Sequence, residues 1–228
     1  MAPEFDQYAQ DYEALQKDPI RRSFSSDGAF FYERKWDLIR AFFKSLGRDL
    51  RNLSWLDIGC GRGDLLRLGR SQFASVSGCD VSAGMLNLCA DITTRPMPDP
   101  VSLPFADASF DFLTAVCVYH HVAPGQRAAL TREAARVLRR DGIFAVIEHN
   151  PVNPATRLIV RRLPMDRNAI LLNARETRHL LEEAGLAAID TRYFLYLPEG
   201  AYRIFPGFEA ALKRIPLGGQ YAVFGQKR

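Results

Sequence analysis

The sequence contains no long apolar run. Within its 228 residues the longest nearly apolar stretch is eight residues, 112–119, and Thr114 interrupts it. A helix that crosses a membrane needs about 20 apolar residues, so the sequence excludes such a span. Residues 1–6 contain neither a basic segment nor an apolar one, which argues against a secretory leader. From these absences we expect a cytoplasmic protein.

Cysteine and histidine are scarce, with four residues of each. The cysteines form no C-x-x-C pair and stand at Cys60, Cys79, Cys89 and Cys117. This spacing argues against both a disulfide framework and a structural zinc site. Two of the four fall in segments that we expect to be buried strands. We therefore predict free, buried thiols in a reducing compartment.

Charge of one sign is not concentrated enough to indicate a nucleic-acid-binding protein. The chain has 30 basic and 26 acidic residues, for a net charge of +4. In its densest basic segment, 157–167, Asp166 partly offsets four arginines. Two interpretations of this segment stay open, a solvated helix face or contact with a phosphate-bearing partner. No nucleic-acid motif accompanies it, so we expect no nucleic-acid partner.

Strand and helix patterns alternate at short spacing from residue 54 to residue 149. Apolar and β-branched segments predict strands at 54–60, 75–80, 110–118 and 143–148, with amphipathic helices between them. Such alternation favours an α/β fold with a parallel sheet and right-handed crossovers. Two aromatic-rich strands are expected nearer the end, at 190–197 and 220–226. No linker divides the chain, so we predict one domain over residues 1–228.

A glycine-rich turn follows the first predicted strand. Residues 57–63 read Asp-Ile-Gly-Cys-Gly-Arg-Gly, and a helix is expected to begin at once. Glycines let a ligand approach the backbone closely, and a helix N-terminus favours anions. No Gly-Lys-Ser/Thr follows, which excludes a phosphate-binding P-loop, and the third glycine comes one residue earlier than in the dinucleotide fingerprint. The turn predicts a ligand held against the backbone.

Asp80 ends the second predicted strand, 19 residues after Gly61. An acidic side chain in that place can accept hydrogen bonds from both hydroxyls of a ribose. Its alternative role is to cap the next helix, but Ser82 already fills that role well. We therefore predict that Asp80 binds a ribose.

Four segments together resemble the class I S-adenosylmethionine-dependent methyltransferases. Residues 57–63 match the first motif of that family, and residues 78–86 match the second. Residues 99–111 match the family's D-x-x-x-L-P-F…S-F-D segment. Residues 136–142 resemble its R-V-L-K-P-G-G turn, although an arginine and an aspartate replace the usual proline and glycine. Each motif is weak alone, and together they are specific.

The resemblance implies a doubly wound, seven-stranded, mainly parallel sheet with helices on both faces and an antiparallel last strand. It also implies S-adenosyl-L-methionine as methyl donor and S-adenosyl-L-homocysteine as product. Donor contacts are then expected from Asp57, Gly59, Cys60, Gly61, Asp80, Val81, Met85, Asp99, Pro100 and Val116. Two alternatives stay open, a nicotinamide-dependent oxidoreductase and a non-catalytic, cofactor-binding partner subunit.

Histidines and a glutamate follow the fourth and fifth predicted strands, where open α/β sheets bind ligands. We predict that His120 and Glu148 face the transferring methyl. His120 is the expected general base, because the ordinary pKa of histidine is about 6.5. Glu148 is expected to orient groups or stabilise charge. His121, His149 and Asn150 are further candidates for substrate contact.

Other roles stay open for these further candidates. His121 could bond a backbone carbonyl, and His149 and Asn150 could only shape the turn. Metal binding by the histidines is a further alternative, but adjacent histidines rarely bind one ion without a third positioned ligand. We therefore predict no metal site.

The run E-H-N-P-x-N-P-x-T-R at residues 148–157 resembles a bacterial methyltransferase subgroup associated with polysaccharide or natural-product pathways. The resemblance suggests a small-molecule acceptor that is methylated on oxygen or nitrogen. The aromatic-rich residues 1–33 are predicted to form a lid, with Tyr8 and Tyr12 facing the acceptor. Residues 150–215 are predicted to contribute to the acceptor pocket. The alternative is that most of these aromatic residues belong to the core.

Overall fold

The computed structural model describes residues 6, 8, 18–25 and 27–228, and its centre is a seven-stranded sheet. The strand order is β3-β2-β1-β4-β5-β7-β6. The strands are β1 (Ser54–Ile58), β2 (Ser75–Asp80), β3 (Thr93–Pro96), β4 (Phe110–Val116), β5 (Leu138–His149), β6 (Leu186–Phe194) and β7 (Gln220–Lys227). The first five strands pair in parallel, whereas β7 runs antiparallel to both of its neighbours. The predicted mainly parallel sheet with an antiparallel last strand is confirmed.

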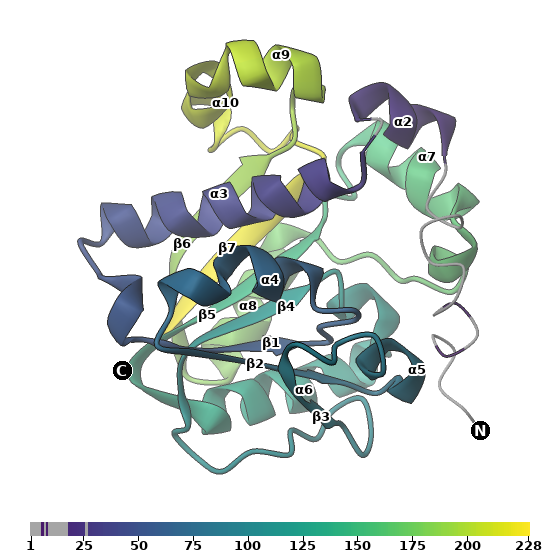
Figure 1. Ribbon diagram of the computed structural model, residues 1–228. Helices are drawn as coiled ribbons and strands as arrows, with labels where there is room; N and C mark the ends of the chain where they lie inside the picture. Colours follow the sequence, from purple (N-terminus) through teal and green to yellow (C-terminus); the bar gives the residue numbers. More distant parts are fainter. Residues whose placement is uncertain (1–5, 7, 9–17, 26) are drawn as a thin grey trace.

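Helices cover both faces of this sheet (Figure 1). On one face lie α3 (Ala29–Ser45) and α4 (Asp64–Gly69), whose apolar side chains join a largely aromatic core. There Phe42 of α3 stacks on Phe224 of β7, with ring centroids 3.7 Å apart. On the other face lie α6 (Pro124–Val137) and α8 (Ala174–Glu183), which pack a largely aliphatic core. Burial of both sheet faces explains why β4 and residues 143–147 of β5, at the centre of the sheet, are mainly apolar.

The remaining helices are short. They are α2 (Pro19–Phe24), α5 (Ala83–Leu86), α7 (Pro154–Arg162), α9 (Glu199–Ile204) and α10 (Pro206–Leu212), with 3₁₀ turns η2 (Leu50–Asn52), η3 (Arg70–Gln72), η4 (Tyr119–His121) and η5 (Pro164–Asp166). α2 and α7 contact each other although they are far apart in sequence (Figure 1). In the part of the chain that the structure describes, no helix is long and apolar enough to cross a membrane.

Two predicted boundaries were wrong for local reasons. The strand predicted to begin at Ile143 begins at Leu138 instead. Asp141 has a φ of +61°, and the pairing with β4 shifts register between Phe110 and Phe112. Residues 136–142, which end in Asp-Gly, suggested a turn before the strand. In the structure Asp141 and Gly142 instead form an irregularity within β5. The pattern of residues 83–90 predicts a helix after the second strand. The helix found there, α5, is shorter and ends at Leu86.

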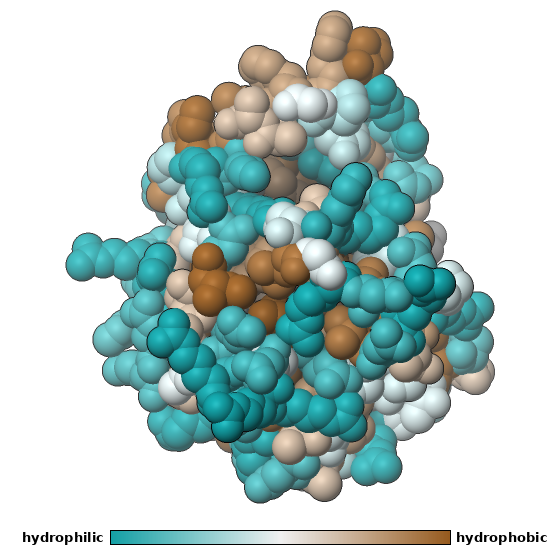
Figure 2. All heavy atoms as spheres, turned by 90° about the vertical axis from the view of Figure 1, so that its left-hand side faces the viewer, coloured by the Kyte–Doolittle hydropathy of each residue, from teal (hydrophilic) through white to brown (hydrophobic). Residues whose placement is uncertain are grey.

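The α9–α10 segment stands above α3 and is held there by a buried ion pair between Arg34 and Glu209 (Figure 1). Apolar side chains are exposed at its surface, at the top of the molecule (Figure 2). They include Ile204, Phe205 and Phe208, of which 69%, 62% and 57% is exposed. These three side chains are not among the residues that line the central cavity.

Candidate active site

One cavity of about 620 Å³ opens where the parallel strands β1, β2, β4 and β5 end. Its walls come from the loops after these strands, from the start of β7, and from helices α2, α3 and α7. This is the edge at which open α/β sheets bind ligands. We describe it as two halves. The nucleotide half follows β1, β2 and β3, and the polar half follows β4 and β5.

The ten residues that the sequence predicts as donor contacts all line this cavity. They are Asp57, Gly59, Cys60, Gly61, Asp80, Val81, Met85, Asp99, Pro100 and Val116. They come from four separate strand ends, and the parallel sheet brings these ends to one edge. The spacing that suggested them in the sequence therefore corresponds to proximity in space.

The glycine-rich turn leaves room for a ligand. Gly59 has a φ of +66°, and a Cβ atom there would lie 2.5 Å from a methyl group of Val118. Gly61 has a φ of +53°, and a Cβ atom there would meet no atom within 4 Å. The first glycine is thus required by close packing, and the second borders open space in a conformation that L side chains rarely adopt.

Asp80 is held by the backbone around it. Its carboxylate accepts hydrogen bonds from the Gly61 amide at 2.8 Å and from the Ser82 amide at 2.8 Å. Burial raises the pKa of Asp80, while these amide bonds lower it. Ser82 caps α5 by accepting from the Met85 amide at 3.1 Å, as the sequence suggested. Asp80 is therefore fixed in place and free of the helix-capping role.

A contact that the sequence did not reveal joins the N-terminal segment to this half. The Asp6 carboxylate accepts from the Ser82 hydroxyl at 2.5 Å and from the Gly84 amide at 2.9 Å. These bonds lower the pKa of Asp6. No spacing rule connects Asp6 with residues so distant in the chain, so only the folded structure reveals the contact.

Asp57 lies at the junction of the two halves. Burial raises its pKa to about 7, and it accepts a hydrogen bond from the Thr114 hydroxyl at 2.5 Å. Lys35 of α3 lines the same cavity, and burial lowers the pKa of its ammonium group. Sequence analysis missed Lys35, although a lysine next to the buried apolar face of α3 was a usable signal. Together the two residues put opposite charges on one cavity wall.

His120 occupies the polar half and is almost completely buried. Its Nδ1 lies 2.6 Å from Glu148 Oε2, and its Nε2 lies 3.5 Å from Asp166 Oδ1. Burial lowers the pKa of His120, but the two carboxylates outweigh it and hold the pKa well above its usual value. The two acids thus favour the protonated form of His120.

Glu148 lies behind His120 and is not among the residues that line the cavity. Its Oε1 accepts from the Tyr119 amide at 2.7 Å. Burial raises its pKa, but the charge of His120 outweighs burial and the pKa is lowered overall. The prediction that Glu148 faces the transferring methyl therefore needs correction, because its side chain is consumed in orienting His120.

The other two histidines of this half also line the cavity. His121 Nε2 lies 3.4 Å from Asp166 Oδ1, and burial lowers the pKa of His121. Burial also lowers the pKa of His149, to about 4, helped by the charge of His120. His149 is therefore neutral at physiological pH.

Asp166 completes this cluster, and sequence analysis missed its part in it. The sequence treated it as an offset to nearby arginines, yet its side chain is buried on η5 and lines the cavity. The chain returns to the histidines because the Ile170 amide donates to the His120 carbonyl at 2.9 Å. The available signal in the sequence was an acidic residue between Met165 and an arginine, and this signal is weak.

Not all residues that the sequence predicts as substrate contacts line the cavity. His121 and His149 line the cavity, whereas Asn150 and Tyr8 are not among its lining residues. Asn150 donates to the Pro216 and Gly218 carbonyls and accepts from the Val152 amide, so it shapes the turn after β5. Tyr12 lies outside the described residues.

Aromatic side chains line the cavity, but they come from the N-terminal side of the chain. Phe24, Phe31 and Tyr32 are lining residues. Phe205 and Phe208, which the sequence suggested as pocket residues, are exposed on the α9–α10 segment (Figure 2). Phe205 and Phe208 thus lie neither in the cavity nor in the core, so neither interpretation of the sequence describes them.

Two lining residues adopt strained backbone conformations. Cys117, directly after β4, has a φ of +57°, and Leu195, directly after β6, has a φ of +61°. Residues with side chains rarely occupy this region, and such strain concentrates at functional sites.

Comparison with known proteins assigns the central part of the chain. Residues 56–146 match the methyltransferase domain family. A tRNA (carboxymethyluridine(34)-5-O)-methyltransferase from Arabidopsis thaliana is 29% identical over 58% of this chain and 32% of its own length. A 27-O-demethylrifamycin SV methyltransferase from Amycolatopsis mediterranei is 35% identical over 40% of this chain and 36% of its own length. The chain thus spans about a third of these two relatives.

Among solved structures, the magnesium protoporphyrin IX methyltransferase of Synechocystis, with S-adenosylhomocysteine bound, is 14% identical. It superposes with a TM-score of 0.68 over 98% of this chain and 96% of its own. That likeness concerns the fold, which has the same seven-stranded plan. Sequence family and fold agree with the motifs at the strand ends. Residues 56–146 match the methyltransferase domain family, and the chain has the fold of the class I S-adenosylmethionine-dependent methyltransferases.

Proposed function

We propose that the protein transfers a methyl group from S-adenosylmethionine to an oxygen or nitrogen atom of a small molecule. One observation carries the proposal: the residues suited to the donor and the histidine cluster line the same cavity. A donor and an acceptor bound there lie within reach of each other. Natural-product and saccharide pathways use such acceptors, and the run at 148–157 resembles enzymes of those pathways.

The nucleotide half fits the donor chemically. Asp80 has acceptor capacity left for two ribose hydroxyls, since each carboxylate oxygen holds two lone pairs. Gly61 borders open space of the kind that a close ligand needs. Met85 and Asp99 line the end suited to an adenine. Asp57 offers a carboxylate to the donor's ammonium group, and Lys35 offers a cation to its carboxylate.

The reaction needs position more than activation, because the sulfonium already makes the methyl group electrophilic. The acceptor atom attacks the methyl carbon in line, the carbon–sulfur bond breaks, and sulfur keeps the electron pair. Holding the two atoms about 3 Å apart supplies much of the rate. The N-terminal segment is proposed to close over both ligands, as its aromatic side chains on the cavity wall suggest.

His120 is the proposed base for the acceptor proton. Its Nδ1 is engaged by Glu148, so the acceptor proton would be taken up at Nε2, which lies 3.5 Å from Asp166 Oδ1. The pKa of His120 is raised, which makes the neutral imidazole a stronger base. The neutral form is then populated at a higher pH than in an ordinary histidine. Glu148 acts as a positioning residue behind it.

A small acceptor suits the walls better than a nucleic acid. The polar half is closed by apolar side chains of Ile159, Leu163 and Met165. The arginines of the basic segment are exposed and are not among the residues that line the cavity, as expected for a solvated surface. The free cysteines of the described chain suit a cytoplasmic setting.

The test is a turnover screen with a methyl-labelled donor. Candidate hydroxylated and amino metabolites from the neighbouring pathway are incubated with the enzyme, and mass spectrometry detects label transfer. Transfer to a small molecule supports the proposal. Donor binding without transfer to any acceptor, including RNA, would support the non-catalytic alternative, and transfer to RNA alone would overturn the small-molecule assignment.

A further inference from the structure

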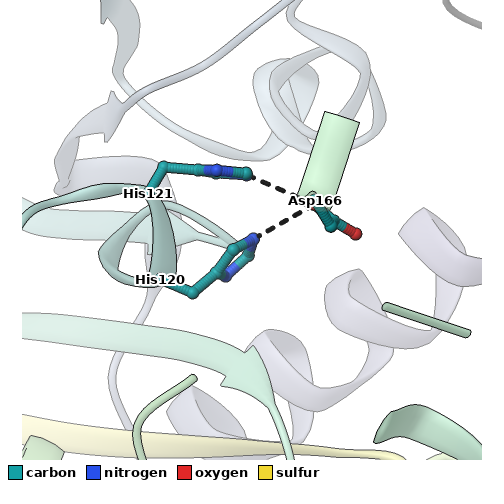
Figure 3. Close-up of side chains that lie close together, drawn as sticks. All are labelled: His120, His121 and Asp166. Carbon is teal, nitrogen blue, oxygen red and sulfur yellow. Dashed lines mark ion pairs between the residues drawn. The ribbon is translucent and has the colours of Figure 1, made fainter. Parts of the chain in front are cut away.

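Three ligand-type atoms converge on one point in the polar half of the cavity. Nε2 of His120, Nε2 of His121 and a carboxylate oxygen of Asp166 lie within 4.8 Å of one another. Figure 3 shows both imidazole rings directed at the same carboxylate. Asp166 is the third positioned ligand whose absence argued against a metal in the sequence.

The separations suit a small cation. Two atoms that each lie about 2.1 Å from one tetrahedral ion are about 3.4 Å apart. The Asp166 oxygen lies 3.5 Å from His120 Nε2 and 3.4 Å from His121 Nε2. An ion can therefore bind with little displacement of the carboxylate. The side chain of His121 is 21% exposed and the more open of the two to adjustment.

The surroundings of His120 match those of a metal ligand. Ligand histidines almost always donate their second ring N–H to a carboxylate or carbonyl, which fixes the ring and leaves the other nitrogen for the ion. The 2.6 Å contact between His120 Nδ1 and Glu148 Oε2 supplies that support from a fully buried residue. Two carboxylates near the site also offset the charge of a divalent ion.

We propose that His120, His121 and Asp166 form a binding site for a divalent transition-metal ion, with open coordination positions facing the cavity. Two imidazoles and one carboxylate are ligands typical of Zn²⁺ or Fe²⁺, whereas Mg²⁺ and Ca²⁺ prefer oxygen alone. Methyl transfer involves no electron transfer, so Zn²⁺ is the simplest occupant.

This site deepens the proposed function and rests on it for its role. A hydroxyl of the acceptor that binds the ion loses its proton more easily. In that form the ion takes over from His120 as the means of deprotonation. The oxygen then forms the new bond to the methyl carbon, sulfur leaves with the electron pair, and the proton passes to water. The site selects acceptors that carry a hydroxyl beside a second oxygen able to chelate.

The first test measures metal binding without any substrate. Untagged protein is stripped with a chelator and titrated with Co²⁺ and Zn²⁺, followed by visible absorption and calorimetry. We expect one ion per chain, and a loss of more than about 100-fold in affinity for Asp166→Asn and for His121→Ala. Glu148→Gln should weaken binding by about 10–100-fold. His179→Ala is the matched control, because His179 is exposed and pairs with Glu183 on α8.

Two results overturn the site. One is the lack of stoichiometric binding to the parent protein, and the other is equal binding to the parent and His121→Ala. Folding of each variant is checked by thermal unfolding in chelator, and His121→Ala decides if Asp166→Asn fails to fold. Binding of S-adenosylhomocysteine is measured in parallel. If the parent protein does not bind S-adenosylhomocysteine, the proposed function is contradicted. If it binds S-adenosylhomocysteine but no metal ion, only this site is contradicted.

Discussion

The two halves of the cavity are built in different ways. In the nucleotide half, the backbone forms much of the site. Glycines at positive φ make the turn, and the amides of Gly61 and Ser82 hold Asp80. In the polar half, side chains from separate segments meet, because Asp166 of η5 returns to the histidines of η4. A site of the first kind depends on local sequence, and a site of the second kind depends on the whole fold.

The difference has a chemical consequence. The nucleotide half presents a fixed set of polar groups to a ligand that is common to the whole family. The polar half presents His120, whose protonated form is favoured, and the neutral His149 beside a carboxylate. Acceptor chemistry can therefore vary with a few side chains while the donor half stays unchanged.

The largest effect should come from removing the base or ligand nitrogen of the polar half. His120→Ala is expected to lower turnover by about 10²–10⁴-fold, while affinity for S-adenosylhomocysteine changes little. Steady-state kinetics with the identified acceptor checks this, and His179→Ala serves as a control on an exposed helix face. A decrease of two- or three-fold would mean that proximity alone drives the transfer.

The next largest effect belongs to the nucleotide half. Asp80→Ala should remove two hydrogen bonds to the ribose. Because two bonds to one carboxylate are not additive, donor binding should weaken by about 2–4 kcal/mol. Calorimetry measures the change.

Gly61→Val should be at least as damaging, because Gly61 has a φ of +53° and borders the space for the ligand. Gly125→Ala is its control, since a Cβ atom there also meets nothing within 4 Å but the backbone carries no positive φ. Near-parent affinity in both folded variants, Asp80→Ala and Gly61→Val, would remove the donor site from this half.

A smaller effect should appear in the pH dependence of donor binding. Asp57 has a raised pKa of about 7, and its charged neighbours are Asp80 and Lys35. Below that pH the carboxyl is neutral and cannot pair with the donor's ammonium, so affinity should fall as the pH drops, by up to about tenfold per unit. Asp57→Asn should remove this dependence between pH 6 and 8. A parent affinity that stays flat over this range would contradict the role of Asp57.

The smallest effect concerns the N-terminal segment. Asp6→Ala removes the bonds to the Ser82 hydroxyl and the Gly84 amide. If the segment closes over the donor, affinity for S-adenosylhomocysteine should fall by about 2- to 10-fold, the range for one or two modest hydrogen bonds. Asp27→Ala, on the exposed turn before α3, is the control. Equal affinities in the two variants would argue against closure.

Much of the nucleotide half could be predicted from the sequence. Asp57 is the last residue but one of β1, Gly61 lies in the turn after β1, and Asp80 ends β2. Parallel strands put their carboxyl ends together whatever the details of packing. The seven strands and the antiparallel β7 followed from the resemblance, whereas the order of the strands came from the structure. Local rules sufficed here because each residue sits next to a recognisable element.

The polar half could be predicted in part. His120 and His121 lie in η4, shortly after β4, and His149 ends β5, so the sequence pointed to them. Asp166 could not be assigned, because its place depends on how the chain after α7 turns back across the histidines. Lys35 was missed for a similar reason, since a helix pattern does not say which polar residue faces a cavity. Both require the tertiary structure.

The most direct measurement is a titration of three proteins with S-adenosylhomocysteine: the parent, Asp80→Ala and His120→Ala. The account predicts one binding site in the parent, a loss of about 2–4 kcal/mol in Asp80→Ala, and unchanged affinity in His120→Ala. Equal affinity in the parent and Asp80→Ala, or a preference of the parent for NAD, would contradict the division of the cavity into a donor half and an acceptor half.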